Sequence, residues 1–231
     1  MALYICASPI GNLDDVSQRL LDTLRNVVLV CAEDTRHTAR LLARFEIQVA
    51  LTSCHQHTSP SKIEALVQRL EEGEEMALLT DAGTPGVCDP GPALVTAAAN
   101  RGVEILPIPG PCALTAALSI SGFDAQKFSF LGFLPRKDGK RRKVLLEVLE
   151  RQETFCLYES PFRVVATLKS IAEVAPENQL IVCRELTKKF EETLRGKPAE
   201  VLETLETRTA IKGEFVIVVS NPPVKKRASE D

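Results

Sequence analysis

One loop of the sequence crowds glycine, proline and acidic residues together. The segment Asp81–Pro92 reads DAGTPGVCDPGP and holds three Gly, three Pro and two Asp in twelve residues. Glycine lets a backbone approach a ligand closely, and proline limits the conformational freedom of a loop. Loops between a strand and a helix usually have ~2–6 residues, so this length favours a ligand-binding loop, although a long structural turn stays open.

The loop does not match the common nucleotide-binding motifs. GxGxxG is absent after the apolar run Leu3–Ala7, where it would follow a first strand, and GxxxxGK[ST] is absent from the whole sequence. Neither a nicotinamide-binding protein nor a P-loop NTPase is therefore favoured. No Ser/His/Asp or Cys/His set supplies a clear nucleophile, so covalent catalysis is not expected.

Two pairs of opposite charges could take part in proton transfer or bind phosphate. Asp34 and Arg36 lie in EDTRHT, and Glu185 and Lys188 lie in RELTK. A carboxylate can act as a general base, and its cationic neighbour can hold an anion. Pairs of this kind are also common structural ion pairs, so both interpretations stay open.

A basic run follows a cluster of phenylalanines. Arg136–Lys143 reads RKDGKRRK, and its six basic residues and one acidic residue give a local charge of +5. The whole chain carries −3, so the remaining residues carry −8. The run could bind phosphates, or form a solvated loop and helix start. Phe128, Phe130 and Phe133 could stack bases or simply belong to a strand.

Other features exclude several classes of protein. His55 and His57 could share a face, but no third ligand completes a metal site, and seven scattered cysteines without a CxxC pair predict neither zinc nor a disulfide framework. We therefore expect no metal. No apolar run approaches the ~20 residues of a membrane span, and Asp14 and Asp15 come too early for a secretory signal. A soluble, cytoplasmic protein without a membrane partner is expected.

The first 110 residues alternate apolar runs with amphipathic stretches, which predicts βαβ units. The expected strands are 3–7, 27–32, 48–52, 76–80 and 103–107, and the expected helices are 14–24, 35–45, 61–70 and 93–100. This order predicts an α/β fold with a mainly parallel sheet covered on both faces. Ligands bind at the carboxyl ends of such strands, where Ser8–Asp15, Asp34–His37 and Asp81–Pro92 would lie.

The alternation changes at Pro107–Pro111 (PIPGP), which can continue neither a helix nor a central strand. We therefore expect an N-terminal α/β domain at 1–110, a C-terminal α/β domain at 111–220 and a flexible tail at 221–231. In the second domain the expected helices are 113–120, 144–149, 163–174 and 199–207, and the expected strands are 128–133, 154–158, 180–184 and 214–220.

Eight segments taken together resemble the small-subunit ribosomal RNA methyltransferase I family of the tetrapyrrole methylase superfamily. They are SPIGNLDD at 8–15, AEDTRHT at 32–38, LLTDAGTPGVCDPG at 78–91, PIPGPCALTAAL at 107–118, GFLPRK at 132–137, YESPFR at 158–163, RELTK at 184–188 and KGEFVIVV at 212–219. They occur in order from about residue 3 to residue 220, so the resemblance is specific.

The resemblance implies two α/β domains of the tetrapyrrole methylase type, with S-adenosylmethionine in a cleft between them, and a homodimer. It implies methylation of the ribose 2′-hydroxyl of a cytidine in the decoding region of 16S rRNA, within the small ribosomal subunit. A DNA partner is not implied. Two alternatives stay open: a tetrapyrrole methyltransferase, and a non-catalytic ribosome-assembly factor on the same fold.

The resemblance also implies roles for particular residues. Cofactor contacts would fall on Pro9, Gly83, Thr84, Pro85, Val87, Pro111, Cys112, Ala113, Tyr158, Arg184 and Gly213. The resemblance does not supply the catalytic residues. Because the two charge pairs lie on loops that would face the cleft, we hypothesise that Asp34 or Glu185 accepts the hydroxyl proton, and that Arg36 or Lys188 lowers the pKa of the ribose hydroxyl or fixes the phosphate. The basic run would bind RNA through Arg136, Lys137, Lys140, Arg141, Arg142 and Lys143.

The sequence departs from the family pattern in two places. Phe162 stands where the family usually has His, and the chain ends at Asp231 where family members often continue into a small helical domain. If that domain helps to hold RNA, Arg136–Lys143 and Lys225–Arg227 are expected to carry more of the RNA contacts.

Overall fold

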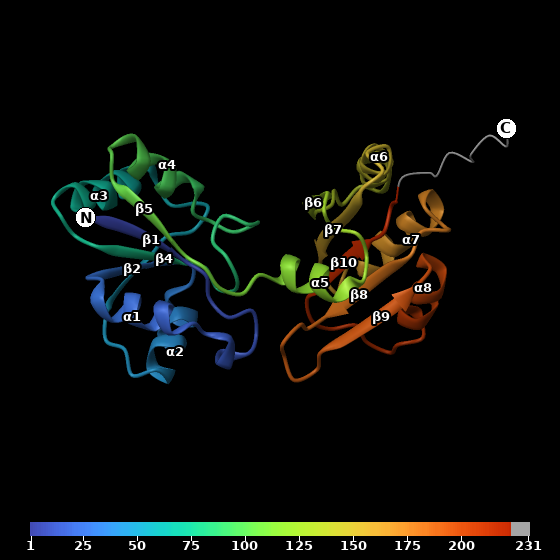
Figure 1. Cartoon of the computed structure of the whole chain (residues 1–231), viewed down its shortest axis with the longest axis horizontal. Helices are drawn as coiled ribbons and strands as arrows, with labels where there is room; N and C mark the ends of the chain where they lie inside the picture. Colours follow the sequence, from blue (N-terminus) through green and yellow to red (C-terminus); the bar gives the residue numbers. More distant parts are fainter. Residues whose placement is uncertain (223–231) are drawn as a thin grey trace, which may run out of the picture. The chain divides into compact units, whose positions relative to one another are not determined.

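A computed structural model describes residues 1–222 of the chain. The chain forms two compact units, Met1–Cys112 and Ala113–Asp231 (Figure 1). Most of the tail expected at 221–231 lies outside the described residues, and so does Lys225–Arg227. No helix within residues 1–222 is long and apolar enough to cross a membrane.

Unit 1 contains a five-stranded sheet in which every strand pair is parallel. Its strands are β1 (Ala2–Cys6), β2 (Leu29–Ala32), β3 (Ala50–Ser53), β4 (Met76–Leu79) and β5 (Glu104–Ile108). They lie in the order β3-β2-β4-β1-β5, so β4 and β1 occupy the centre. The expectation of a parallel, helix-covered sheet is confirmed, and the carboxyl ends of all five strands meet at one edge.

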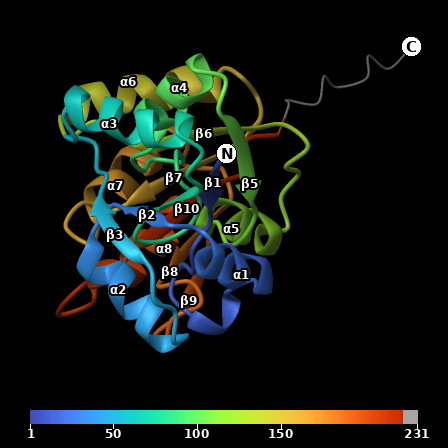
Figure 2. The ribbon, with the colours of Figure 1, turned by 90° about the vertical axis from the view of Figure 1, so that its left-hand side faces the viewer.

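Helices cover both faces of this sheet, as Figure 2 shows. They are α1 (Gln18–Asn26), α2 (Thr35–Arg44), α3 (Pro60–Glu71) and α4 (Pro92–Asn100). Apolar residues of α3 and α4 pack with Leu3, Met76 and Leu78 on one face. Those of α1 and α2 pack with Ala77 and Leu79 on the other. Alternate residues of β4 therefore serve two cores, which explains its continuous apolar character.

The first helix begins later than its hydrophobic spacing predicts. The structure has a short 3₁₀ turn, η1 (Leu13–Asp15), and α1 starts only at Gln18. The Asn12 side chain accepts a hydrogen bond from the Asp14 backbone, and the Ser17 hydroxyl accepts one from the Leu20 backbone. Ser17 thus caps the helix, and a polar cap outweighs apolar spacing in fixing where a helix starts.

Unit 2 contains a mixed five-stranded sheet in the order β6-β7-β10-β8-β9. Its strands are β6 (Phe128–Phe133), β7 (Thr154–Glu159), β8 (Leu180–Arg184), β9 (Glu192–Gly196) and β10 (Phe215–Val219). Only β6 and β7 are parallel. The sequence did not predict β9, an edge strand of sequence ETLRG that has no apolar alternation.

Within residues 113–222 this unit has four helices: α5 (Ala113–Ser121), α6 (Asp138–Leu149), α7 (Val164–Val174) and α8 (Pro198–Glu206). Helices α6, α7 and α8 pack with Phe155, Phe215 and Ile217 in one core. Helix α6 starts six residues before the expected position, so most of the basic run is helical. Both units carry sheets covered by helices, which confirms the predicted α/β class.

Candidate functional site

Three loops converge at the carboxyl edge of the unit 1 sheet. Ser8, just after β1, exchanges two backbone hydrogen bonds with Gly83, at 2.8 Å and 3.1 Å. The Thr84 hydroxyl donates to the Pro111 carbonyl at 3.3 Å. The structure thus joins the loops after β1, β4 and β5. Of the unit 1 residues that were predicted to contact a cofactor, these bonds join Thr84 to Pro111 and hold Gly83 against Ser8. The others, Pro9, Pro85, Val87 and Cys112, adjoin these residues in the chain.

The loop after β4 requires glycine at specific positions. Gly83, Gly86 and Gly91 have φ angles of +80°, +84° and +142°, which favour glycine over residues with a Cβ atom. A turn closed by the Val87 N–H and the Thr84 carbonyl at 3.3 Å surrounds Gly86. Pro9 and Pro85 are buried, so they fix the loop, while exposed backbone such as that of Gly86 can face a ligand.

Thr80 carries an unsatisfied hydroxyl beside this loop. Its side chain follows β4 and is 2% exposed, and within residues 1–222 its Oγ1 atom has no hydrogen-bond partner. The Ser8 hydroxyl donates to the Thr80 carbonyl at 3.1 Å, which fixes the Thr80 backbone. A buried hydroxyl without a partner is costly. Because Thr80 is almost fully buried, a bound polar group could reach this atom only if the loop shifts. No sequence pattern separates Thr80 from the other threonines.

Acidic residues connect the same loop to its neighbours. The Asp34 backbone N–H donates to Asp81 Oδ1 at 3.1 Å, and the Asp81 N–H donates to Glu33 Oε2 at 3.3 Å. The ends of β2 and β4 are therefore cross-linked where the Asp81–Pro92 loop begins. Sequence reasoning missed Glu33 and Asp81 as linking residues, because their partners lie 47 or 48 residues away in the chain.

Asp34 and Arg36 form an ion pair at the start of α2. Asp34 caps the helix by accepting from the Arg36 backbone at 2.8 Å, and the guanidinium donates to both of its carboxylate oxygens at 3.1 Å and 2.7 Å. These hydrogen bonds from Arg36 hold the pKa of the Asp34 carboxyl well below its usual range. Because Arg36 engages both carboxylate oxygens of Asp34, a structural role is favoured over that of a general base.

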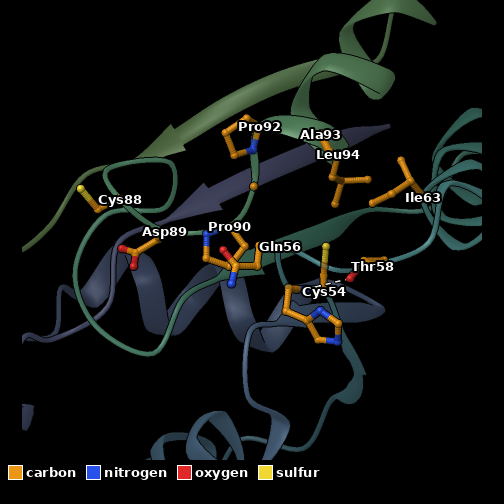
Figure 3. Close-up of a pocket in the computed structure, with 12 residues that line it drawn as sticks. Cys54, Gln56, Thr58, Ile63, Cys88, Asp89, Pro90, Pro92, Ala93 and Leu94 are labelled. Atoms are coloured by element: carbon orange, nitrogen blue, oxygen red, sulfur yellow. Dashed lines mark hydrogen bonds between the residues drawn. The ribbon is translucent and has the colours of Figure 1, made fainter. Parts of the chain in front are cut away.

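A cavity of about 240 Å³ lies between this loop and the one after β3 (Figure 3). His55, Gln56, Thr58 and Asp89 line it, together with apolar side chains such as Leu94. The His55 Nδ1 atom accepts the His57 backbone N–H at 3.1 Å. Within residues 1–222 no group of three His, Cys, Asp or Glu residues is placed to hold a metal.

A second group of predicted site residues gathers at one edge of the unit 2 sheet. Phe215, the first residue of β10, pairs with Glu159 on one side and Arg184 on the other. The carboxyl ends of β7 and β8 therefore meet the start of β10, which places Tyr158, Arg184 and Gly213 at the same edge. The Tyr158 hydroxyl accepts the Leu114 backbone N–H at 3.2 Å, which ties the edge to the residue after Ala113 in α5.

The turn after β8 has an unusual backbone. Glu185 has a φ of +51°, its N–H donates to the Glu214 carbonyl at 2.9 Å, and its Oε1 atom accepts the Glu214 N–H at 3.0 Å. A Cβ atom on Gly213 would lie 2.5 Å from Glu185 Cγ, so only glycine fits there. The Arg184 side chain donates to the Lys212 carbonyl at 2.6 Å. This set fixes Glu185 against the strand that follows Gly213.

Lys188 links two carboxylates in this turn. Its ammonium lies 3.0 Å from Glu185 Oε1 and 2.8 Å from Glu214 Oε2. Burial alone would raise the pKa of Glu185, but hydrogen bonds from the Glu214 backbone and from Lys188 outweigh it and lower the pKa. Burial likewise disfavours charge on Lys188, yet Glu214 and Glu185 raise its pKa above the usual value. The sequence did not identify Glu214 as a partner of Lys188, because the two residues lie 26 positions apart in the chain.

The basic run divides into exposed and engaged side chains. Arg136, Lys137 and Lys140 are exposed and have no ion pair within residues 1–222, and the side chain of Lys143 is 78% exposed. Arg142 is engaged with Asp138 and Glu173. Arg141 is 5% exposed, and its guanidinium donates to Ser170, Asp138 and the Arg136 carbonyl.

The prediction that Arg141 binds RNA is therefore wrong. Its side chain is buried, and the hydrogen bonds of its guanidinium join the start of α6 to α7. A basic run does not reveal which of its cations turns inward, because that depends on the helix phase and on Ser170, which lies 29 residues further along.

Comparison with known proteins places the chain in a family. Residues 2–202 match the family described as Tetrapyrrole (Corrin/Porphyrin) Methylases. Proteins named ribosomal RNA small subunit methyltransferase I are 44% identical in Vibrio cholerae and 45% identical in Xylella fastidiosa. Each match covers 94% of this chain, with 76% and 80% of the relative covered. The protein of that name from Borrelia garinii subsp. bavariensis is 41% identical, with 94% and 98% covered.

Solved structures share the fold at lower identity. The methyltransferase CobJ aligns with a TM-score of 0.70 at 17% identity, covering 95% of this chain and 94% of that chain. Uroporphyrin-III C-methyl transferase from Thermus thermophilus, complexed with S-adenyl homocysteine, aligns with a TM-score of 0.65 at 16% identity, covering 95% and 97%. By its match over residues 2–202 and its identity to these relatives, the chain belongs to the tetrapyrrole methylase family and, within it, to the ribosomal RNA small subunit methyltransferase I family.

Proposed function

We propose that the protein is an S-adenosylmethionine-dependent methyltransferase that methylates the 2′-hydroxyl of a cytidine ribose in the decoding region of 16S rRNA. The observation that carries the proposal is identity of 41–45% over 94% or more of the chain to proteins named ribosomal RNA small subunit methyltransferase I. The substrate is the rRNA of the small ribosomal subunit, acted on in the cytoplasm by a homodimer.

The loops of unit 1 fit a polar cofactor. Gly83 and Thr84 are held beside Pro111, and the unsatisfied Thr80 hydroxyl adjoins them in the chain. Exposed backbone of the loop after β4 supplies further donors and acceptors. Within unit 1 we assign cofactor contacts to Pro9, Gly83, Thr84, Pro85, Val87, Pro111 and Cys112. Within unit 2 we assign cofactor contacts to Ala113, Tyr158, Arg184 and Gly213.

The cofactor and the protein divide the chemistry between them. When bound, S-adenosylmethionine supplies a methyl group that its sulfonium already activates. The residues of this chain then have to orient the ribose and accept the hydroxyl proton, and alignment alone can provide much of the rate enhancement.

Glu185 is the better candidate for the base. Both hydrogen bonds that its carboxylate accepts within the described residues go to Oε1, so Oε2 can accept a proton from a ribose hydroxyl. Its lowered pKa makes it a weak base. A weak base is sufficient here, because the hydroxyl becomes strongly acidic as its oxygen forms a third bond, to the incoming methyl group. Lys188 would hold the carboxylate ionised and could contact a phosphate. Asp34 and Arg36 would position the Asp81–Pro92 loop.

A labelling experiment tests the proposed function. The purified protein is incubated with S-adenosylmethionine that carries a labelled methyl group and, separately, with free 16S rRNA, small ribosomal subunits and uroporphyrinogen III. We expect label in RNA, at a position that resists alkaline hydrolysis, because a methylated 2′-oxygen cannot attack the neighbouring phosphate.

The other outcomes identify the alternatives. Label in the tetrapyrrole alone would overturn the RNA assignment. Retained binding to small subunits without label in any substrate would favour a non-catalytic assembly factor. If alkali instead cleaves the RNA at the labelled position and releases a labelled nucleotide with an unmodified ribose, the methyl group lies on a base. That outcome would contradict 2′-O-methylation.

A further inference from the structure

The loops that follow β6 and β7 in unit 2 carry exposed aromatic and cationic side chains. Phe162 is 94% exposed and Phe133 is 55% exposed. Arg136, Lys137 and Lys140 are exposed on the loop after β6 and the first turn of α6, without an ion pair in the described chain. We call these five residues the Phe162 surface. Single exposed apolar residues are common, but aromatic rings combined with free cations are characteristic of nucleic-acid-binding surfaces.

The fold holds the two loops of this surface together. The Arg163 guanidinium donates to the Leu134 carbonyl, which joins the loop after β7 to the loop after β6. The same guanidinium lies 3.4 Å from the buried Glu159 carboxylate, whose other oxygen accepts the Thr167 hydroxyl at 2.7 Å. Phe162 precedes Arg163 in a turn closed onto Ser160 at 3.1 Å. The exposed ring therefore stands on a fixed backbone, which lowers the entropy lost on binding.

The surface borders the predicted cofactor residues of unit 2. Phe133 pairs with Tyr158 across β6 and β7, and their ring centroids lie 6.0 Å apart at an interplanar angle of 64°. The Phe133 ring is thus held in place by Tyr158, while about half of Phe133 remains exposed.

We propose that the Phe162 surface binds an unpaired segment of the RNA substrate, with Phe162 and Phe133 stacking on bases and with Arg136, Lys137 and Lys140 contacting phosphates. The inference rests on the proposed function, since it takes RNA as the substrate. Three cations argue for a polyanion, and exposed aromatic faces argue for bases that are not already paired and stacked. A paired RNA helix presents neither free base faces nor room for the rings.

Substitutions of the full-length protein test the proposal. Stacking contributes ~1–3 kcal/mol per base, so Phe162→Ala is expected to weaken binding of a short single-stranded RNA by about 5–150-fold. Phe162→Trp should restore binding, because it retains an aromatic face. Methylation of small subunits by Phe162→Ala should show a raised KM with nearly unchanged kcat, and the Kd for S-adenosylmethionine should not change. Phe133→Ala should act in the same direction.

Phe128→Ala is the matched control, because Phe128 lies at the other end of β6 and is 39% exposed. It should bind the RNA as wild type does, and thermal melting checks that each variant is folded. Wild-type RNA binding by both Phe162→Ala and Phe133→Ala would overturn the proposal. The proposal would also be overturned if Phe128→Ala weakened RNA binding as much as Phe162→Ala does. The same holds if Phe162→Ala weakened binding of a fully paired RNA as much as binding of a single strand.

Two further outcomes distinguish this proposal from the proposed methyltransferase activity and from binding of a second copy of the chain at the same surface. If Phe162→Ala weakens RNA binding while wild-type protein methylates no RNA, the stacking surface stands and the proposed activity fails. If Phe162→Ala shifts a dimer to monomer in sedimentation and leaves RNA binding intact, a second copy of the chain covers the surface and the proposal is wrong.

Discussion

Thr80 pairs its own backbone with Ser8 but leaves its side-chain hydroxyl without a partner in the described part of the chain. Valine has nearly the same shape without the hydroxyl. We expect Thr80→Val to keep or slightly raise the free energy of unfolding of the ligand-free protein, since no hydrogen bond is lost.

The same substitution should weaken S-adenosylmethionine binding. One neutral hydrogen bond contributes about 0.5–1.5 kcal/mol, which corresponds to roughly a 2–10-fold increase in Kd. Chemical denaturation and titration calorimetry measure the two effects. Unchanged affinity combined with reduced stability would contradict the prediction, because the hydroxyl would then serve the fold alone.

Glu185 is expected to accept the ribose proton, and Glu185→Gln removes that capacity while keeping the shape of the side chain. General-base catalysis contributes about 10²–10⁴-fold, so kcat should fall by a factor in that range at saturating S-adenosylmethionine. Glu203→Gln, an exposed change on α8, is the control and should leave kcat unchanged. A normal kcat for Glu185→Gln, with a large loss for Asp34→Asn, would instead assign the base to Asp34.

The Glu185 carboxylate should also make stability depend on pH. Its pKa is lowered in the folded protein, so its contribution is present above its ordinary pKa of 4.5 and is lost as pH falls through the folded value. The free energies of unfolding of wild type and Glu185→Gln should therefore converge below pH 4.5. For Lys188, whose pKa is raised, the contribution is lost only as pH rises past 10.5. Denaturation series at both extremes measure these changes.

At the scale of elements, the turn after β8 and the approach to β10 fit each other through Gly213. Its φ is +99°, and an added Cβ atom would lie 2.5 Å from Glu185 Cγ. Gly73 has nearly the same φ, +101°, with nothing within 4 Å of an added Cβ atom. The two positions therefore separate backbone strain from steric overlap.

We expect Gly73→Ala to cost only the strain, about 1–3 kcal/mol, without loss of methyl transfer. Gly213→Ala should cost more and should reduce kcat, because Glu185 must move. Thermal denaturation and methyl-transfer assays compare the two variants. If the two variants are equally stable and equally active, the turn after β8 accommodates the added Cβ atom, and the prediction is wrong.

Much of the element pattern could be predicted, because buried strands such as Met76–Leu79 and amphipathic helices such as Thr35–Arg44 carry strong local signals. The starts of α1 and α6 were misplaced, since a cap and a charged first turn decide them. Strand β9 was missed, because its pairing with β8 depends on long-range contacts and not on its own polar sequence.

The candidate site was predictable where its chemistry is carried by sequence motifs. RELTK pointed to Glu185 and Lys188, and the structure pairs them at 3.0 Å. Thr80, Glu214 and the inward turn of Arg141 were not predictable, since burial and the identity of a distant partner define them. A local sequence pattern shows which polar groups are present. Which of these groups have a hydrogen-bond or ion-pair partner depends on the fold.

At the scale of the whole molecule, charge is segregated. Six basic residues and one acidic residue of the chain lie in Arg136–Lys143, while the rest of the chain is net negative. Replacing Arg136, Lys137 and Lys140 with alanine should weaken RNA binding and reduce the slope of log K against log salt by about 2, since each phosphate contact on a single strand contributes about 0.7.

The control removes the same charge from other surfaces, through Arg25→Ala, Arg101→Ala and Lys169→Ala, which are engaged in ion pairs with Asp22, Glu64 and Glu206. Salt titrations of RNA binding compare the two triple variants. Equal slopes would show that net charge alone governs binding and that the exposed run has no special role.

The position of β10 has a consequence for the order in which the chain folds during synthesis. Unit 1 is complete at Cys112, so its sheet can close while the ribosome is still adding the second half. In unit 2 the strand that joins β7 to β8 is β10, which is made after both. Until Val219 has emerged, β7 and β8 each expose an unpaired edge. The nascent protein therefore passes through a stage in which unit 1 is folded while unit 2 has two separate partial sheets. At this stage the exposed edges of β7 and β8 could pair with strands of other chains.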